Sequence, residues 1–127
     1  MVKQIDHWKL EHFVTYLYVC IAKADYNLVD EEIVEIYKKL KRFNEDEEVN
    51  KKLLQEVLRA YAFHSDSEII QFIKTNSPKY CETEEEKKKL IKDLEDIMEA
   101  DGIVKDVEMV MYRYIKKVLN SGVIQNT

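Results

Sequence analysis

ADYNLVDEE at residues 24–32 and ADGIVKDVE at residues 100–108 align without a gap, and they decide how the rest of the chain is interpreted. Both have Ala first, Asp second, Asp seventh and Glu ninth, with an apolar residue at the fifth position. Each follows one apolar stripe with helical spacing and precedes another. The Ala lets two helices approach closely, and the apolar residue can fill the turn from inside. We therefore predict two similar acidic helix-turn-helix corners.

The sequence outside the corners predicts more helices and no sheet. Two Gly and one Pro in 127 residues are too few for the turns of a hairpin-rich β fold. Apolar spacing and capping boxes predict helices over 6–24 and 30–43, one between Asn44 and His64, a short one from Ser65 that stops before Pro78, and two over 83–100 and 106–119. The expected fold is all-α, a compact bundle of about six to seven helices. It forms one domain over residues 1–127, with a loose tail from about residue 120.

Composition limits the classes of partner. The net charge is −5, from 20 basic and 25 acidic residues, which argues against a nucleic-acid binder because no basic stripe is present. No apolar run approaches the ~20 residues of a transmembrane helix, and the first residues lack the apolar core of a signal peptide. Cys20 and Cys81 are read as one core thiol and one loop thiol in a reducing compartment. The expected location is the cytoplasm.

Residues 24–32 and 100–108 resemble the signature of the TerB-like family of tellurite-resistance-associated proteins. That signature is Ala-Asp-Gly-x-[Ile/Val]-x-x-x-Glu at a turn between helices, once near each end of an all-helical domain. The second stretch fits well, whereas the first has Tyr26 in place of Gly. Neither stretch has the Pro that many members carry where Asp30 and Asp106 stand. Specific matching covers about eighteen positions.

The resemblance implies a non-catalytic domain of the bacterial response to tellurite and other chemical stress. It implies a divalent cation such as Ca²⁺ at the acidic corners, with Asp25, Glu32, Asp101 and Glu108 as candidate ligands. Similar domains fused to DnaJ-type co-chaperones act as interaction modules. The alternative is therefore a pure protein-interaction or scaffold domain without metal. The expected partner is another protein, and a homodimer stays open.

The corner residues also have a purely structural interpretation. Each Asp can close one helix, and each Glu can accompany the N-terminus of the next, where acidic residues are favoured. The EF-hand pattern is absent, and one corner supplies too few oxygens for a cation that prefers six to eight. A good site needs further ligands from Asn27 or Asp30, or from the other corner brought nearby by folding. Gly102 makes the second corner the better ligand candidate, since Gly readily adopts positive φ.

Other motifs give weaker signals. His7, His12 and Glu11 could form a soft-metal site, although the two His are five residues apart rather than four. No catalytic triad, nucleophile elbow or phosphate-binding glycine loop is present, so no catalytic residue is predicted. An enzyme with paired carboxylates would need a deep pocket and a raised pKa. Tyrosines including Tyr16 and Tyr18 are expected at the core rim, with their hydroxyls in water.

Overall fold

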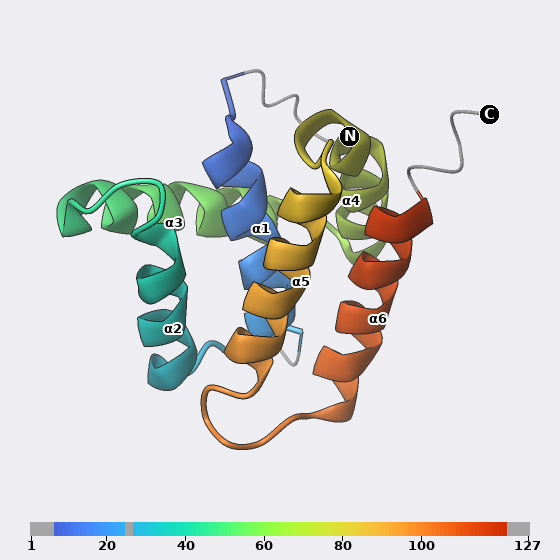
Figure 1. Cartoon of the computed structure of the whole chain (residues 1–127). Helices are drawn as coiled ribbons and strands as arrows, with labels where there is room; N and C mark the ends of the chain where they lie inside the picture. The colour runs from blue at the N-terminus through green and yellow to red at the C-terminus, as the bar shows by residue number, and fades with distance from the viewer. Residues whose placement is uncertain (1–6, 25–26, 122–127) are drawn as a thin grey trace.

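The computed structural model describes residues 7–24 and 27–121, and within them it contains six helices and no strand. The helices are α1 (Leu10–Ala22), α2 (Asp30–Leu40), α3 (Glu47–Phe63), α4 (Asp66–Tyr80), α5 (Glu84–Met98) and α6 (Asp106–Ser121) (Figure 1). This confirms the all-α bundle. Because α6 continues through Ser121, residues 120 and 121 are helical rather than part of the predicted tail.

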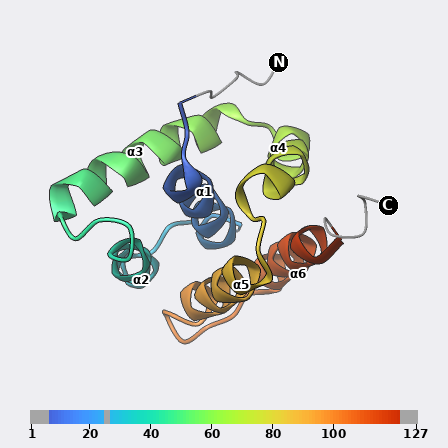
Figure 2. The ribbon, with the colours of Figure 1, turned by 45° about the horizontal axis from the view of Figure 1, so that its top comes forward.

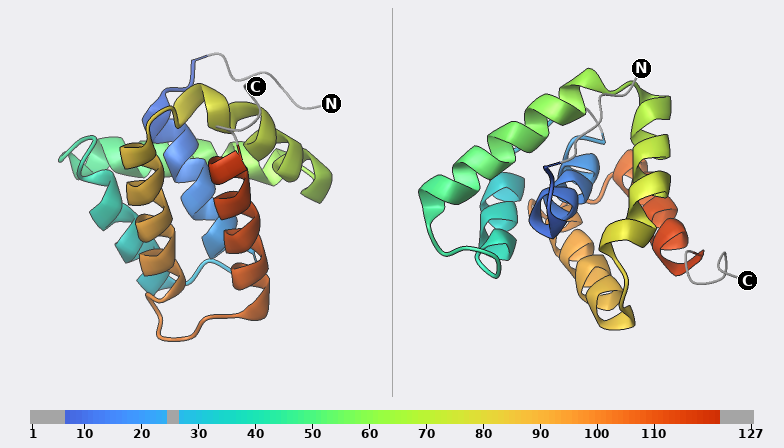
Figure 3. Two further views of the ribbon diagram at one scale, coloured as in Figure 1. Left: turned by 45° about the vertical axis from the view of Figure 1, so that its right-hand side comes forward. Right: turned by 90° about the horizontal axis from the view of Figure 1, so that it is seen from above.

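The first helix, α1, runs through the middle of the molecule and contacts each of the other five helices (Figures 2 and 3). Every residue from Phe13 to Ala22 is buried. The prediction of a single apolar face on this helix was wrong, because the residues between the stripe positions are apolar as well. A helix that is apolar all round is a core helix. None of the helices described is both long and apolar enough to cross a membrane.

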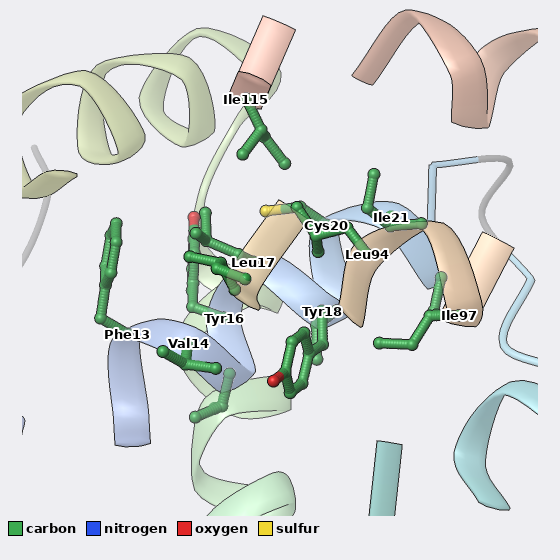
Figure 4. Close-up of a cluster of buried hydrophobic side chains, with 14 of the residues drawn as sticks. Phe13, Val14, Tyr16, Leu17, Tyr18, Cys20, Ile21, Leu94, Ile97 and Ile115 are labelled. Atoms are coloured by element: carbon green, nitrogen blue, oxygen red, sulfur yellow. The ribbon is translucent and has the colours of Figure 1, made fainter. Parts of the chain in front are cut away.

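Figure 4 shows side chains of α1 leaving the helix in several directions to fill the core. Tyr16 and Tyr18 are fully buried, which corrects the prediction that their hydroxyls reach water. The Tyr16 hydroxyl lies 2.7 Å from His64 Nδ1, and the Tyr18 hydroxyl donates to Asp93 at 2.6 Å. A buried hydroxyl needs such a partner. Cys20 lies in α1 and Cys81 in the connection between α4 and α5, as predicted, and both free thiols are buried.

The predicted helix starts at Ser65 and Thr83 are confirmed, but the reciprocal bond of a capping box forms only at Ser65, because the Glu86 carboxylate pairs with Arg42. Ser65 accepts from the backbone N–H of Glu68, and Thr83 accepts from that of Glu86. The predicted stop before Pro78 was wrong, since α4 continues to Tyr80. The Tyr80 ring stacks on Phe13, with 5.1 Å between ring centroids, and this core packing outweighs the hydrogen bond that proline removes.

Candidate functional site

The two acidic corners lie at the same end of the bundle, where α1 and α5 end and α2 and α6 begin (Figures 1 and 3). Glu32 is in the first turn of α2, and Glu108 is in the first turn of α6. Both side chains are buried, with only 2% of each residue exposed. Folding therefore brings together two of the four predicted ligands. We call Glu32 and Glu108 the corner pair.

Each glutamate of the corner pair is held by the backbone at the start of its own helix. Val29 N–H donates to Glu32 Oε1 at 3.2 Å, and Lys105 N–H donates to Glu108 Oε1 at 3.0 Å. These amides belong to the residue just before each helix, where backbone N–H groups have no partner within the helix. The structural interpretation of the two glutamates as helix-start residues is thus confirmed. Both of these bonds use Oε1 of the glutamate.

The carboxyl groups of the corner pair are in hydrogen-bonding contact with each other. Burial raises the pKa of Glu32 to about 8, and the hydrogen bond with Glu108 adds to that rise. The Val29 N–H opposes the rise, while the negative charges of Glu108 and Asp101 reinforce it. Two carboxylates so close together cannot both ionise easily. The pair therefore holds a proton at neutral pH.

Asp101 lies at the edge of this group. Its Oδ1 accepts from the backbone N–H of Ile103 at 3.0 Å, which closes the turn after α5. Gly102 has φ of 80°, as predicted from its permissive backbone. Asp101 is partly exposed and close enough for its charge to act on Glu32. The fourth predicted ligand, Asp25, lies outside the described residues.

The donor set limits what the corners can bind. Among residues 7–24 and 27–121, no three His, Cys, Asp or Glu side chains are arranged to hold a metal ion. Two facing carboxylates suit a hard cation that keeps several waters, as Mg²⁺ does. Neither the hollow beside Asn50 and Glu56 nor the hollow between α4 and α6 is lined by Glu32 or Glu108.

The predicted soft-metal site forms a different arrangement. His7 and His12 converge on Glu56 of α3 rather than on Glu11, with Nε2–carboxylate distances of 2.6 and 3.6 Å. The Lys9 N–H donates to His12 Nδ1 at 3.1 Å, so the neutral ring carries its proton on Nε2. That nitrogen then has no lone pair for a metal. Glu56 is 49 residues from His7, too far for local spacing to reveal it.

A second polar cluster, which the sequence did not predict, lies between α2 and α5. Lys39 Nζ lies 3.0 Å from Glu35, 2.6 Å from Asp96 and 4.0 Å from Asp93. We call these four residues the seam. Asp93 also accepts the Tyr18 hydroxyl. The available signal was Asp93 itself, an acidic residue at a core-facing position between Leu90 and Ile97.

Comparisons with protein-family models, curated proteins and solved structures give no match. The resemblance to the TerB-like family therefore depends on the corner residues quoted from the sequence. The structure adds to them a physical contact between the two corners.

Proposed function

We propose that this chain is a non-catalytic, TerB-like binding module of the bacterial stress response. In this proposal, the corner pair binds a hard divalent cation such as Mg²⁺ or Ca²⁺ in place of the proton it holds. The observation that carries the proposal is the contact between Glu32 and Glu108, two buried carboxyls contributed by separate corners.

The electrostatics of the pair support a cation. A buried carboxylate is costly unless it is paired, and the charged groups that shift the pKa of Glu32 are both acidic. A divalent cation neutralises both carboxylates, whereas a proton neutralises only one. The backbone bonds at Oε1 fix the position of both carboxyls, so that the two together would bind the cation. Asp101 contributes charge from the edge, and waters complete the coordination.

The test is calorimetric titration of the protein with Mg²⁺, Ca²⁺ and Zn²⁺ at pH 8.5. Glu108→Gln and Glu32→Gln keep the side-chain length and an oxygen for the backbone amide, and each removes one carboxylate. We expect the wild type to bind Mg²⁺ or Ca²⁺ and both variants to lose that binding. Glu31→Gln is the matched control, because Glu31 is an exposed neighbour in the same helical turn. Absence of binding by the wild type rejects the cation.

Competition with the proton gives a second readout. Cation binding must displace the proton held by the pair, so affinity rises with pH and levels off above about 8, the raised pKa of Glu32. An affinity that does not change between pH 6 and pH 9 contradicts binding at this site.

A protein-interaction module without metal is the second candidate function. The observation that favours it is the apolar surface around α6, where Val107 and Val110 are exposed. It predicts recovery of a reproducible partner by the wild type and equally by Glu108→Gln. A partner lost on removal of divalent cations favours the first candidate instead.

A further inference from the structure

Apolar side chains are exposed around one helix more than anywhere else in the described part of the chain. The described residues include eight large apolar residues that are exposed. Five of these lie on α6, on the loop before it or on the facing turn of α4. The five are Ile70, Ile103, Val104, Val107 and Val110. A concentration of this kind marks an interaction surface, whereas single exposed apolar residues do not.

Two exposed valines and the partly buried Tyr114 form a second stripe on α6 beside its core face. Tyr112, Ile115 and Leu119 pack into the core. Val107, Val110 and Tyr114 are spaced by three and four residues, as on one face of a helix that contacts another helix. Val110 is 65% exposed and stands at the middle of the stripe.

The stripe borders a hollow between α4 and α6. The hollow has a volume of about 300 Å³, and its lining includes Ile69, Ile70, Val110 and Met111. The Tyr114 hydroxyl donates to the carbonyl of Ile70 at 3.2 Å, which ties the two walls together. Side chains from a partner helix can therefore enter a preformed space.

The charges beside the stripe indicate which partner fits. Asp106 and Arg113 are exposed and seven residues apart, so they lie on the same flank of α6. When two copies of α6 pack antiparallel about a two-fold axis, this flank meets itself. Asp106 of each copy then lies near Arg113 of the other, which gives two symmetric ion pairs. In a parallel arrangement this flank would instead face the opposite flank of the other copy, and the two ion pairs would not form.

We infer that α6 is a self-association surface, on which a second copy of this chain packs antiparallel through Val107, Val110 and Tyr114. A stripe of this length buries less than the ~1,200 Å² of a standard interface. The dimer is consequently weak, with a dissociation constant of about 10–100 μM.

Sedimentation equilibrium in EDTA tests this inference independently of any cation. Between about 10 μM and 1 mM, the wild-type mass should rise from 15.2 kDa toward twice that value. Val110→Glu places two like charges near the two-fold axis and should keep the protein monomeric. Val34→Glu alters a similarly exposed valine on α2 and should dimerise like the wild type. A wild type that stays monomeric throughout overturns the inference.

Charge exchange tests the antiparallel arrangement. Arg113→Glu and Asp106→Lys should each weaken dimerisation by about tenfold, because each turns two attractive pairs into repulsive ones. The double variant restores both pairs and should dimerise within about threefold of the wild type. Circular dichroism melts check that each variant is folded. A double variant weaker than either single variant overturns the self-association surface proposed here.

Discussion

The corner pair and the seam use the same kind of residue under opposite electrostatic conditions. In the seam, burial opposes ionisation of Asp96, but hydrogen bonds from Lys39 and Lys92 lower the pKa of its carboxyl. At the corners, burial and a second carboxyl together raise the pKa of Glu32. The chain thus supplies lysines for the acidic residues of the seam and leaves those of the corner pair to a proton. This difference makes the corner pair the better candidate for a ligand from solution.

The largest effect we expect comes from removing the lysine of the seam. Its acidic residues then lose their shared positive charge and repel one another, as the carboxyls of the corner pair do. Lys39→Met keeps the apolar stem but leaves Glu35, Asp93 and Asp96 without their shared partner. We expect a loss of about 2–3 kcal/mol in the free energy of unfolding at pH 7, measured by urea denaturation.

Lys92→Met is the matched control for that change. Lys92 also bonds Asp96, at 2.9 Å, but its side chain is 69% exposed. Exposed pairs contribute little, so this variant should unfold nearly as the wild type does. Equal losses from the two lysine variants would mean that Lys39 stabilises the acidic residues of the seam no more than an exposed lysine does.

Replacing one carboxyl of the corner pair should change how stability depends on pH. The pKa of Glu32 is about 8 in the folded protein, above its ordinary value of 4.5. Between these values the folded state holds a proton that the unfolded state has released, so rising pH favours unfolding. This contribution to stability is complete below pH 4.5 and is lost as the pH rises through 8.

Glu108→Gln removes the facing charge, and the amide introduced there can donate to Glu32. We expect the variant to match the wild type at pH 5 and to exceed it at pH 8.5 by on the order of 1–2 kcal/mol in urea unfolding. Glu31→Gln should follow the wild type at both pH values. A wild-type curve parallel to that of Glu108→Gln would refute the shared proton.

A smaller effect should show how much the backbone conformation of the second corner contributes to stability, independently of its carboxylates. Gly102 has positive φ, and a Cβ added there would meet nothing within 4 Å. Gly102→Ala should therefore cost about 1 kcal/mol through backbone strain alone, measured by thermal unfolding. Gly102→Asn should cost less, because Asn tolerates this conformation better. If Ala and Asn cost the same, strain is not the cause.

The smallest expected effect concerns Asp101. Asp101→Asn keeps the oxygen that accepts from Ile103 and removes only the charge that acts on Glu32. Stability at pH 7 should change by less than about 0.5 kcal/mol, while Asp101→Ala loses the turn and should cost more. In calorimetry, Asp101→Asn should bind the cation more weakly than the wild type. A large loss of stability in Asp101→Asn would mean that the charge of Asp101 stabilises the fold rather than serving cation binding.

Features set by neighbouring residues were predictable from the sequence. Ser65 and Thr83 begin helices through bonds three residues away, and Gly102 adopts the conformation expected of it. Both corner glutamates were placed correctly in first turns. Pro78 shows the limit of local rules, because the packing of Tyr80 against a distant helix carries α4 past it.

Long-range contacts were not predictable in this way. Glu32 and Glu108 are far apart in the sequence, and only the packing of α2, α5 and α6 around α1 brings them together. The same holds for His7 with Glu56 and for Tyr18 with Asp93. In each case the sequence shows a polar residue at a notable position, but its partner depends on the tertiary structure.

The central position of α1 has a consequence for synthesis of the protein. This helix precedes in the chain all five helices that cover it. Its apolar surface leaves the ribosome before the residues of α5 and α6 have been made, and it stays uncovered until translation reaches them. Nascent chains with such exposed segments are prone to aggregation. This topology favours a chaperone that holds the α1 segment until α6 has emerged.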